Sequence, residues 1–238
     1  MYKRLPFFIL ITTLAFMPLR GSPPGVPGAV VQSWHYDPTT KQVTVRLVNT
    51  SSKDITAFNL SVTEKYADGT ADSSERMTDY LPLMASVAAQ SGLQQYGNGT
   101  FPAGTSRDVT FPETKDPVDV SVTVDVVAYA DHTADATNQR AFSNLVSNRK
   151  DMVLATQQAN KVIKNALATP NPKDAAVKEL KRLADVAKAQ GGGLFEMTLR
   201  GHIQSAQQAP DLAALIKEGE TRIAIYAPHT QLVKGGQQ

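Results

Sequence analysis

The chain of 238 residues contains no cysteine. This absence excludes disulfide bonds, thiolate chemistry, cysteine-ligated metals and a lipidated cysteine behind a leader. For an exported chain it also argues against a small disulfide-stapled module and for a fold that its apolar core holds together. Apolar residues make up 42% of the chain, which is sufficient for such a core at this length.

The chain has no excess of basic over acidic residues once the N-terminus is set aside. The formal net charge is +2, but three of the 24 basic side chains, Lys3, Arg4 and Arg20, lie within the first 22 residues. The rest of the chain therefore carries 21 basic against 22 acidic side chains. Without a general basic field, the sequence argues against a nucleic-acid partner.

A long apolar run occurs only near the N-terminus. Lys3 and Arg4 precede a nearly uninterrupted apolar stretch from Leu5 to Leu19, and a proline- and glycine-rich segment follows. This pattern is typical of a secretory signal peptide. The apolar run is shorter than the roughly 20 residues that a helix needs to span a bilayer. We therefore expect residues 1–22 to be a signal peptide and residues 23–28 a linker. We expect the mature chain to be secreted or periplasmic, with no stable membrane span.

The cleavage position is less clear than the leader itself. No good small-residue cleavage motif lies near Leu19, and cuts after Gly21 or Gly28 are both imperfect. An uncleaved N-terminal anchor is therefore the alternative to a signal peptide.

Apolar and polar residues alternate with a period of two through the first half of the chain. Val43, Val45 and Leu47 alternate with polar residues, and the alternation resumes at Phe58 after a polar turn. This pattern predicts an antiparallel hairpin with one buried face. Further strands are expected at 29–36, 75–81 and 105–111, whereas residues 82–95 suit a helix or a loop. The clearest strand is expected at 118–129, with five valines on its buried face: Val118, Val120, Val122, Val124 and Val126.

From about Arg140 the apolar spacing changes to that of helices. A long helix is expected to end at Thr169–Pro172, and a second helix at Gly191–Gly193. Two shorter helices are expected around 194–206 and 210–226. We therefore predict a β-sandwich at 29–137, a helical region at 140–227 and a flexible tail at 228–238.

The residues Leu47 to Phe58 (LVNTSSKDITAF), followed by Tyr66-Ala67-Asp68-Gly69, resemble the immunoglobulin-like or fibronectin-like domains of secreted bacterial proteins. The resemblance covers about residues 29–131 and implies a binding, adhesion or spacer module. Antibody-type domains have a cysteine pair and a tryptophan on the third strand, whereas Trp34 falls in the first expected strand. The resemblance is thus to the architecture. The predicted fold class is α+β, an antiparallel immunoglobulin-like sandwich followed by a helical hairpin and two shorter helices.

Four aspartates form the most site-like pattern. Carboxylates can gather at one end of a sandwich to bind Ca²⁺, and Asp68, Asp131 and Asp135, together with Asp72, are the candidate metal ligands. The simpler interpretation is that these aspartates stabilise turns in water. The four histidines, His35, His132, His202 and His229, have no ligand spacing.

No pattern of catalytic residues stands out. A Gly-x-Ser-x-Gly motif is missing, and nothing singles out a carboxylate pair such as Glu64 with Glu75. The sequence therefore predicts no catalytic residue and no cofactor.

These observations favour an exported, non-enzymatic binding or structural module of the cell envelope, with an unknown protein or glycan partner. The apolar stripe of the long helix makes a homo-oligomer through the helical region possible. The alternative is a periplasmic enzyme or enzyme accessory with a cleft between sandwich and helices and Asp68, Asp131 or His132 at its rim. That alternative requires a deep polar pocket at the junction.

Overall fold

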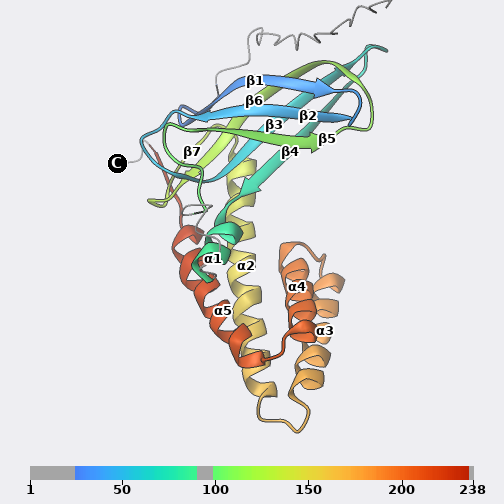
Figure 1. Cartoon of the computed structure of the whole chain (residues 1–238), viewed down its shortest axis with the longest axis vertical. Helices are drawn as coiled ribbons and strands as arrows, with labels where there is room; N and C mark the ends of the chain where they lie inside the picture. The colour runs from blue at the N-terminus through green and yellow to red at the C-terminus, as the bar shows by residue number, and fades with distance from the viewer. Residues whose placement is uncertain (1–24, 90–98, 236–238) are drawn as a thin grey trace, which may run out of the picture.

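The structure, a computed structural model, describes residues 25–89 and 99–235. The expected signal peptide, the first two residues of the linker and the part of 82–95 beyond Ala89 lie outside the described residues. The fold is mixed α+β: strands fill the first half of the chain and most helices lie in the C-terminal half. Figure 1 shows two layers of sheet from which a group of helices projects to one side.

The strands form two sheets whose apolar faces pack on each other. Every described pairing is antiparallel except that of β7 with β8. The smaller sheet has the order β1 (Ala29–Asp37), β2 (Gln42–Asn49) and β5 (Ser106–Pro112). The larger sheet has the order β4 (Ala71–Asp79), β3 (Ile55–Tyr66), β6 (Pro117–Tyr129), β7 (Thr133–Ala136) and β8 (Val233–Lys234).

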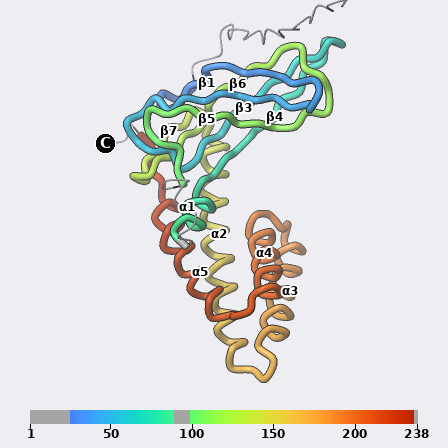
Figure 2. Tube along the Cα trace, viewed as in Figure 1, coloured from blue at the N-terminus to red at the C-terminus, as the bar shows by residue number. Residues whose placement is uncertain are grey.

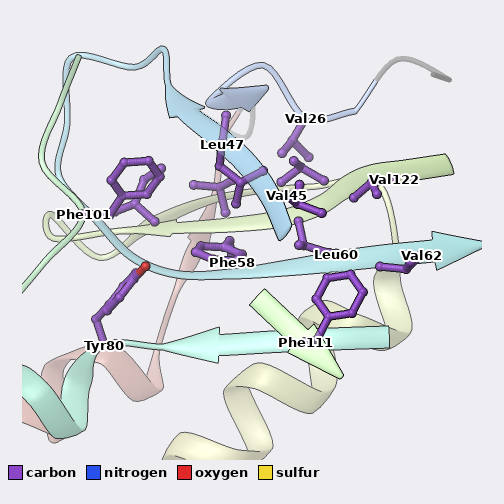
Figure 3. Close-up of a cluster of buried hydrophobic side chains, with 14 of the residues drawn as sticks. Val26, Val45, Leu47, Phe58, Leu60, Val62, Tyr80, Phe101, Phe111 and Val122 are labelled. Atoms are coloured by element: carbon purple, nitrogen blue, oxygen red, sulfur yellow. The ribbon is translucent and has the colours of Figure 1, made fainter. Parts of the chain in front are cut away.

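The alternating residues of the sequence form the core between the sheets. Val45 and Leu47 of β2 face Phe58 and Leu60 of β3, and all four side chains are buried (Figure 3). Val26 also lies in this core, and its backbone N–H donates to the Val124 carbonyl at 3.0 Å. The segment expected to be a linker is therefore packed on the sheets at Val26.

The prediction that five valines share one buried face of β6 is wrong at both ends. Val118 is the second residue of β6 and is 61% exposed. The register between β3 and β6 shifts between Asn59 and Leu60, so that Val126 faces away from the core between the sheets and packs against Leu145. A bulge inserts one residue into a strand and reverses the faces beyond it. Helix α2 covers this second face near Val126, so β6 is buried on both faces there.

Five helices are described, one of them within the β half. Helix α2 leaves the larger sheet and runs away from it, α5 returns beside α2, and the α3/α4 pair packs on the far half of α2 (Figures 1 and 2). None of these helices combines the length and apolar character that crossing a membrane requires. Their bounds are α1 (Leu81–Ala89), α2 (Gln139–Ala166), α3 (Pro172–Ala189), α4 (Leu194–Gln208) and α5 (Leu212–Tyr226).

The C-terminal segment is not the flexible tail that the sequence predicts, at least as far as Gly235. A short 3-10 helix, η2 (Ala227–Thr230), buries His229 against α2, and β8 then pairs in parallel with β7. Burial lowers the pKa of His229 to about 4, and the nearby Arg149 charge adds to the effect. The prediction missed this segment because two paired residues are too few to show a period in the sequence.

Candidate functional site

A pocket of about 420 Å³ lies at the end of the sheets where the C-terminal segment joins them. We call it the end pocket. Three loops and strand β8 meet there, because the β2–β3 loop and the β6–β7 turn lie at the same end of the larger sheet and residues 27–28 run alongside. Its lining includes Gly28, Lys53, Tyr129, Thr133, Asp135 and Lys234.

Lys53 holds the β2–β3 loop against the β6–β7 turn. Its Nζ forms an ion pair with Asp131 Oδ2 at 2.7 Å, donates to Thr133 Oγ1 at 2.9 Å and lies 5.3 Å from the centre of the Tyr129 ring. Asp131 Oδ1 accepts hydrogen bonds from the backbone N–H and hydroxyl of Thr133. Burial opposes ionisation of Asp131, but these hydrogen bonds lower its pKa to about 2. Asp131 is therefore an ionised, fully engaged carboxylate.

Tyr129 and Asp135 form the wall of the end pocket. The Tyr129 hydroxyl donates to Asp135 Oδ2 at 2.6 Å, and burial, followed by this hydrogen bond, raises the tyrosine pKa. The hydroxyl lies where a Cβ of residue 28 would be, at 1.7 Å, so that only glycine fits at Gly28. Lys234 lies over the Phe142 ring and donates to Gln139, which ties β8 to the start of α2.

The four candidate aspartates do not come together. Asp68 lies in the β3–β4 turn, at the opposite end of β3 from Asp131, and its carboxylate accepts from the backbone N–H and hydroxyl of Thr70. These hydrogen bonds lower the pKa of Asp68. Asp72 lies opposite Glu64 in the register of β3 and β4, at that same far end of the sheets. Within residues 25–89 and 99–235, no group of three or more His, Cys, Asp or Glu side chains could hold a metal ion.

A pair of buried carboxyl groups, Glu64 and Glu113, lies between the sheets at the far end, and sequence reasoning missed Glu113. Glu64 is 4% exposed and the side chain of Glu113 is 6% exposed. Tyr66 donates to Glu64 Oε2 at 3.0 Å, and Arg76 Nη2 lies 3.6 Å from Glu113 Oε1. Burial, together with a hydrogen bond to Glu64, raises the pKa of Glu113 to about 7. Glu113 therefore keeps its proton to a higher pH than an isolated carboxyl group does.

Glu64 and Glu75, the carboxylate pair that the sequence left open, do not come together. Glu75 lies opposite Ser61 on the outer face of β4, where Arg140 Nη2 is 3.3 Å from its carboxylate. The sequence does carry a signal for Glu64: it follows Leu60 and Val62 at the same two-residue spacing, which places this acidic residue on the inward face of β3. Glu113 follows strand β5 and had no comparable signal.

His132 lies beside the end pocket but does not face a cleft. Its ring packs edge-on against the His229 ring, with 4.5 Å between the centroids, and its backbone has a φ of 67°. The carbonyl of His132 accepts from the backbone N–H of Val233 at 3.0 Å. His132 therefore helps to hold the C-terminal segment in place.

Comparisons with known proteins add little to this geometry. No family model matches the chain, and no curated protein matches it. One solved structure, of a hypothetical protein from Peptoclostridium difficile 630, is 11% identical and covers 50% of this chain and 91% of its own. Its TM-score is 0.29, so the likeness carries no argument about fold or function.

Proposed function

We propose that the protein is an exported, non-enzymatic binding module of the cell envelope whose end pocket receives a protein or glycan partner. The observation that carries this proposal is the convergence of three loops and strand β8 on one pocket of about 420 Å³ with both polar and apolar groups in its lining. Ligand pockets commonly measure 300–1,000 Å³, and binding residues are concentrated on loops that a rigid scaffold positions.

We further propose that the two sheets form an immunoglobulin-like or fibronectin-like sandwich. The first, second and fifth strands share one sheet, and the third, sixth and seventh share the other, as in immunoglobulin folds. The fourth strand pairs with the third, which departs from the constant-type immunoglobulin arrangement. In such domains the loops at one end of the sandwich form the binding surface, and the end pocket occupies such an end.

The chemistry of the end pocket suits a polar ligand with several hydrogen-bonding groups. Asp135 and Thr133 offer hydrogen-bonding oxygens, and Lys53 and Lys234 offer positive charge, whereas Tyr129 is 4% exposed and its ring is covered by Lys53. Sugars and peptide ends are both bound by a few convergent polar groups of this kind.

The enzymatic alternative has less support. Asp131 is engaged by Lys53 and Thr133, and with a pKa near 2 it is a weak base at neutral pH. Asp68 lies at the other end of the sheets and cannot share a cleft with it. We therefore favour a binding role for this end of the molecule.

Export is tested by expressing the full chain in a bacterial host and measuring the intact mass of the protein in each cell fraction. We expect a mature chain that has lost about the first 22 residues in the secreted or periplasmic fraction. A full-length mass confined to the membrane fraction would contradict export in cleaved form and would indicate an N-terminal anchor.

Binding is tested by titrating the labelled protein with soluble peptidoglycan fragments and, separately, with short peptides, while following its amide resonances. We expect shifts confined to the end pocket, and a dissociation constant at least about tenfold higher for Asp135→Ala. Asp68→Ala is the matched control, since it removes a turn aspartate at the opposite end and should bind as the wild type does. Shifts outside the end pocket, or equal effects of the two substitutions, would contradict this site.

A further inference from the structure

A second hollow, of about 370 Å³, is lined by residues of α2 and α3. The two helices meet in the part of the molecule that projects away from the sheets (Figure 1). Val162 and Ala166 of α2 and Ala175 and Leu183 of α3 form the apolar lining of the hollow. Lys161 and Arg182 stand at its edges and are exposed. We call it the α2/α3 groove.

Two exposed apolar side chains extend the groove toward the sheets. Leu154 is 51% exposed and lies one turn before Gln158, which lines the groove. Val186 is 44% exposed and lies one turn beyond Arg182 and Leu183 on α3. Residues four apart share a helix face, so the apolar stripe continues past the groove. It spans Leu154 to Ala166, or about 18 Å at 1.5 Å per residue.

The charges of the two halves of the molecule are opposite. Residues 25–137 carry seven basic and 14 acidic side chains, a net charge of −7, whereas residues 139–226 carry 13 basic and eight acidic side chains, a net charge of +5. Among the described residues, Lys161 of the groove edge and Lys178, one turn before Arg182, have no ion-pair partner. Glu179 also lines the groove and pairs with Arg182 at 2.7 Å, so the positive charge that remains at the apolar surface comes from Lys161 and Lys178.

The far end of the sheets presents the complementary chemistry. Val118 is 61% exposed there, between the exposed Asp116 and Asp119 at the start of β6. Asp68 lies at the same end, in the β3–β4 turn. We call this surface, Asp68 with Asp116 to Asp119, the acidic tip. Val118 is its apolar centre. Lys65 pairs with Asp119 at 3.3 Å and the exposed Lys115 lies next to Asp116, so the three aspartates exceed these two lysines by one negative charge.

We propose that the α2/α3 groove of one copy of this chain receives the acidic tip of a second copy, with Val118 over the apolar lining and Asp116 and Asp119 near Lys161 and Lys178. The groove and the tip lie on opposite halves of the chain, so the contact is head to tail and can repeat from copy to copy. Two grooves facing each other would instead bring two positively charged surfaces together. The inference goes beyond the proposed function, because it concerns another surface and does not depend on what the end pocket binds.

Sedimentation velocity of the purified protein at about 50 mM and about 500 mM NaCl gives the first readout. We expect concentration-dependent assembly at the lower salt and a dissociation constant at least about tenfold higher at the upper salt. A protein that stays monomeric at low salt at its highest soluble concentration overturns the proposal.

Two double variants give the decisive readout. The groove variant Lys161→Glu/Lys178→Glu and the tip variant Asp116→Lys/Asp119→Lys should each be monomeric alone. Mixed together, they should assemble again as the wild type does, because the unchanged tip of one variant fits the unchanged groove of the other and the two charge-reversed surfaces are again opposite in sign. The control Lys188→Glu/Lys217→Glu makes the same change in net charge at exposed positions elsewhere on the helices and should assemble as the wild type does.

The remaining outcomes all count against the proposal. A tip variant that assembles like the wild type shows that the tip is not the occupant, as expected if two grooves pair with each other or if another surface joins the copies. A mixture that stays monomeric while each variant keeps its native circular dichroism excludes the head-to-tail contact. An assembly that the control variant also loses reflects net charge rather than this groove.

Discussion

At the scale of single residues, Glu64 and Glu113 are placed where two charges are hardest to accommodate. Both carboxyl groups are buried, and one oxygen of each, Oε1, has no hydrogen-bond partner among the described residues when both are ionised. A single proton held between them satisfies both groups and removes one charge. The charge of Arg76 favours ionisation of Glu113 and that of Asp72 opposes it, while the Tyr66 hydroxyl donates to Glu64.

The pair predicts that stability falls as the pH rises. The pKa of Glu113 is raised from its ordinary 4.5 to about 7 in the folded protein. Between these values the folded state keeps a proton that the unfolded state releases, so the free energy of unfolding decreases with pH. From about pH 4.5 to pH 8 we expect the loss to be on the order of 1–3 kcal/mol, and Glu113→Gln should abolish most of this slope. Urea unfolding at several pH values measures it.

Glu75→Gln serves as the control for this prediction, because Glu75 lies on the outer face of β4 beside Arg140. Its pH dependence should match that of the wild type. Equal slopes for the wild type and Glu113→Gln would show that the pair does not retain its proton.

The sequence could indicate some of these residues and not others. Glu64 interrupts an inward-facing apolar series, and Arg149 lies within the apolar stripe of its helix, so both stand out against a period. Their partners do not stand out in this way. Glu113, the partner of Glu64, follows the end of β5, and Asp79, the partner of Arg149, is the last residue of β4; both are far from their partners in sequence. Their position depends on how the strands are arranged, which a single period does not encode.

At the scale of elements, Arg149 joins the start of α2 to the sheets. The side chain is 0% exposed, and its Nε and Nη2 donate to the two carboxylate oxygens of Asp79 at 2.9 and 3.1 Å. Nη2 also donates to the Thr56 hydroxyl at 3.2 Å, and Asp79 Oδ1 accepts from the backbone N–H of Leu81 at the start of α1. One ion pair thus fixes α2, β3, β4 and α1 together.

Removing one partner should cost more than removing both. Arg149→Met leaves Asp79 with a buried, uncompensated charge, and we expect it to lower the free energy of unfolding by about 3–5 kcal/mol. Asp79→Asn should destabilise comparably, and the double variant by clearly less than the sum of the two. Chemical denaturation of all four proteins measures the coupling. Strict additivity would show that the pair contributes nothing as a pair.

Helices and strands with a clear period were predictable, and their exceptions have physical causes. The prolines and glycines of Thr169–Pro172 and Gly191–Gly193 end α2 and α3 where the sequence predicts. The bulge that turns Val126 away from the core between the sheets comes from strand pairing, and the placement of β8 comes from a contact across the whole chain. Neither leaves a local signal. The end pocket, which β8 helps to form, was therefore beyond prediction, although Asp131 and Asp135 beside it were identified.

At the scale of the whole molecule, α2 belongs to two cores. Its first half packs Ala141 and Leu145 on the outer face of the larger sheet, and its second half packs Ala159 and Ile163 with α3, α4 and α5. Because 28 residues form one continuous helix, disorder in one core removes support from the other. Coupling between the two halves of the molecule should therefore depend on the middle of α2.

Unfolding should report this coupling through two independent signals. Trp34 is the one tryptophan and packs against the core between the sheets, whereas circular dichroism at 222 nm follows the helices. We expect the two signals to change together with denaturant in the wild type. Gln157→Pro, at an exposed position in the middle of α2, should cost about 3 kcal/mol and make the helical signal fall before the Trp34 signal. The control Gln157→Ala should leave the two transitions coincident. If the transitions already separate in the wild type, α2 does not couple the two cores.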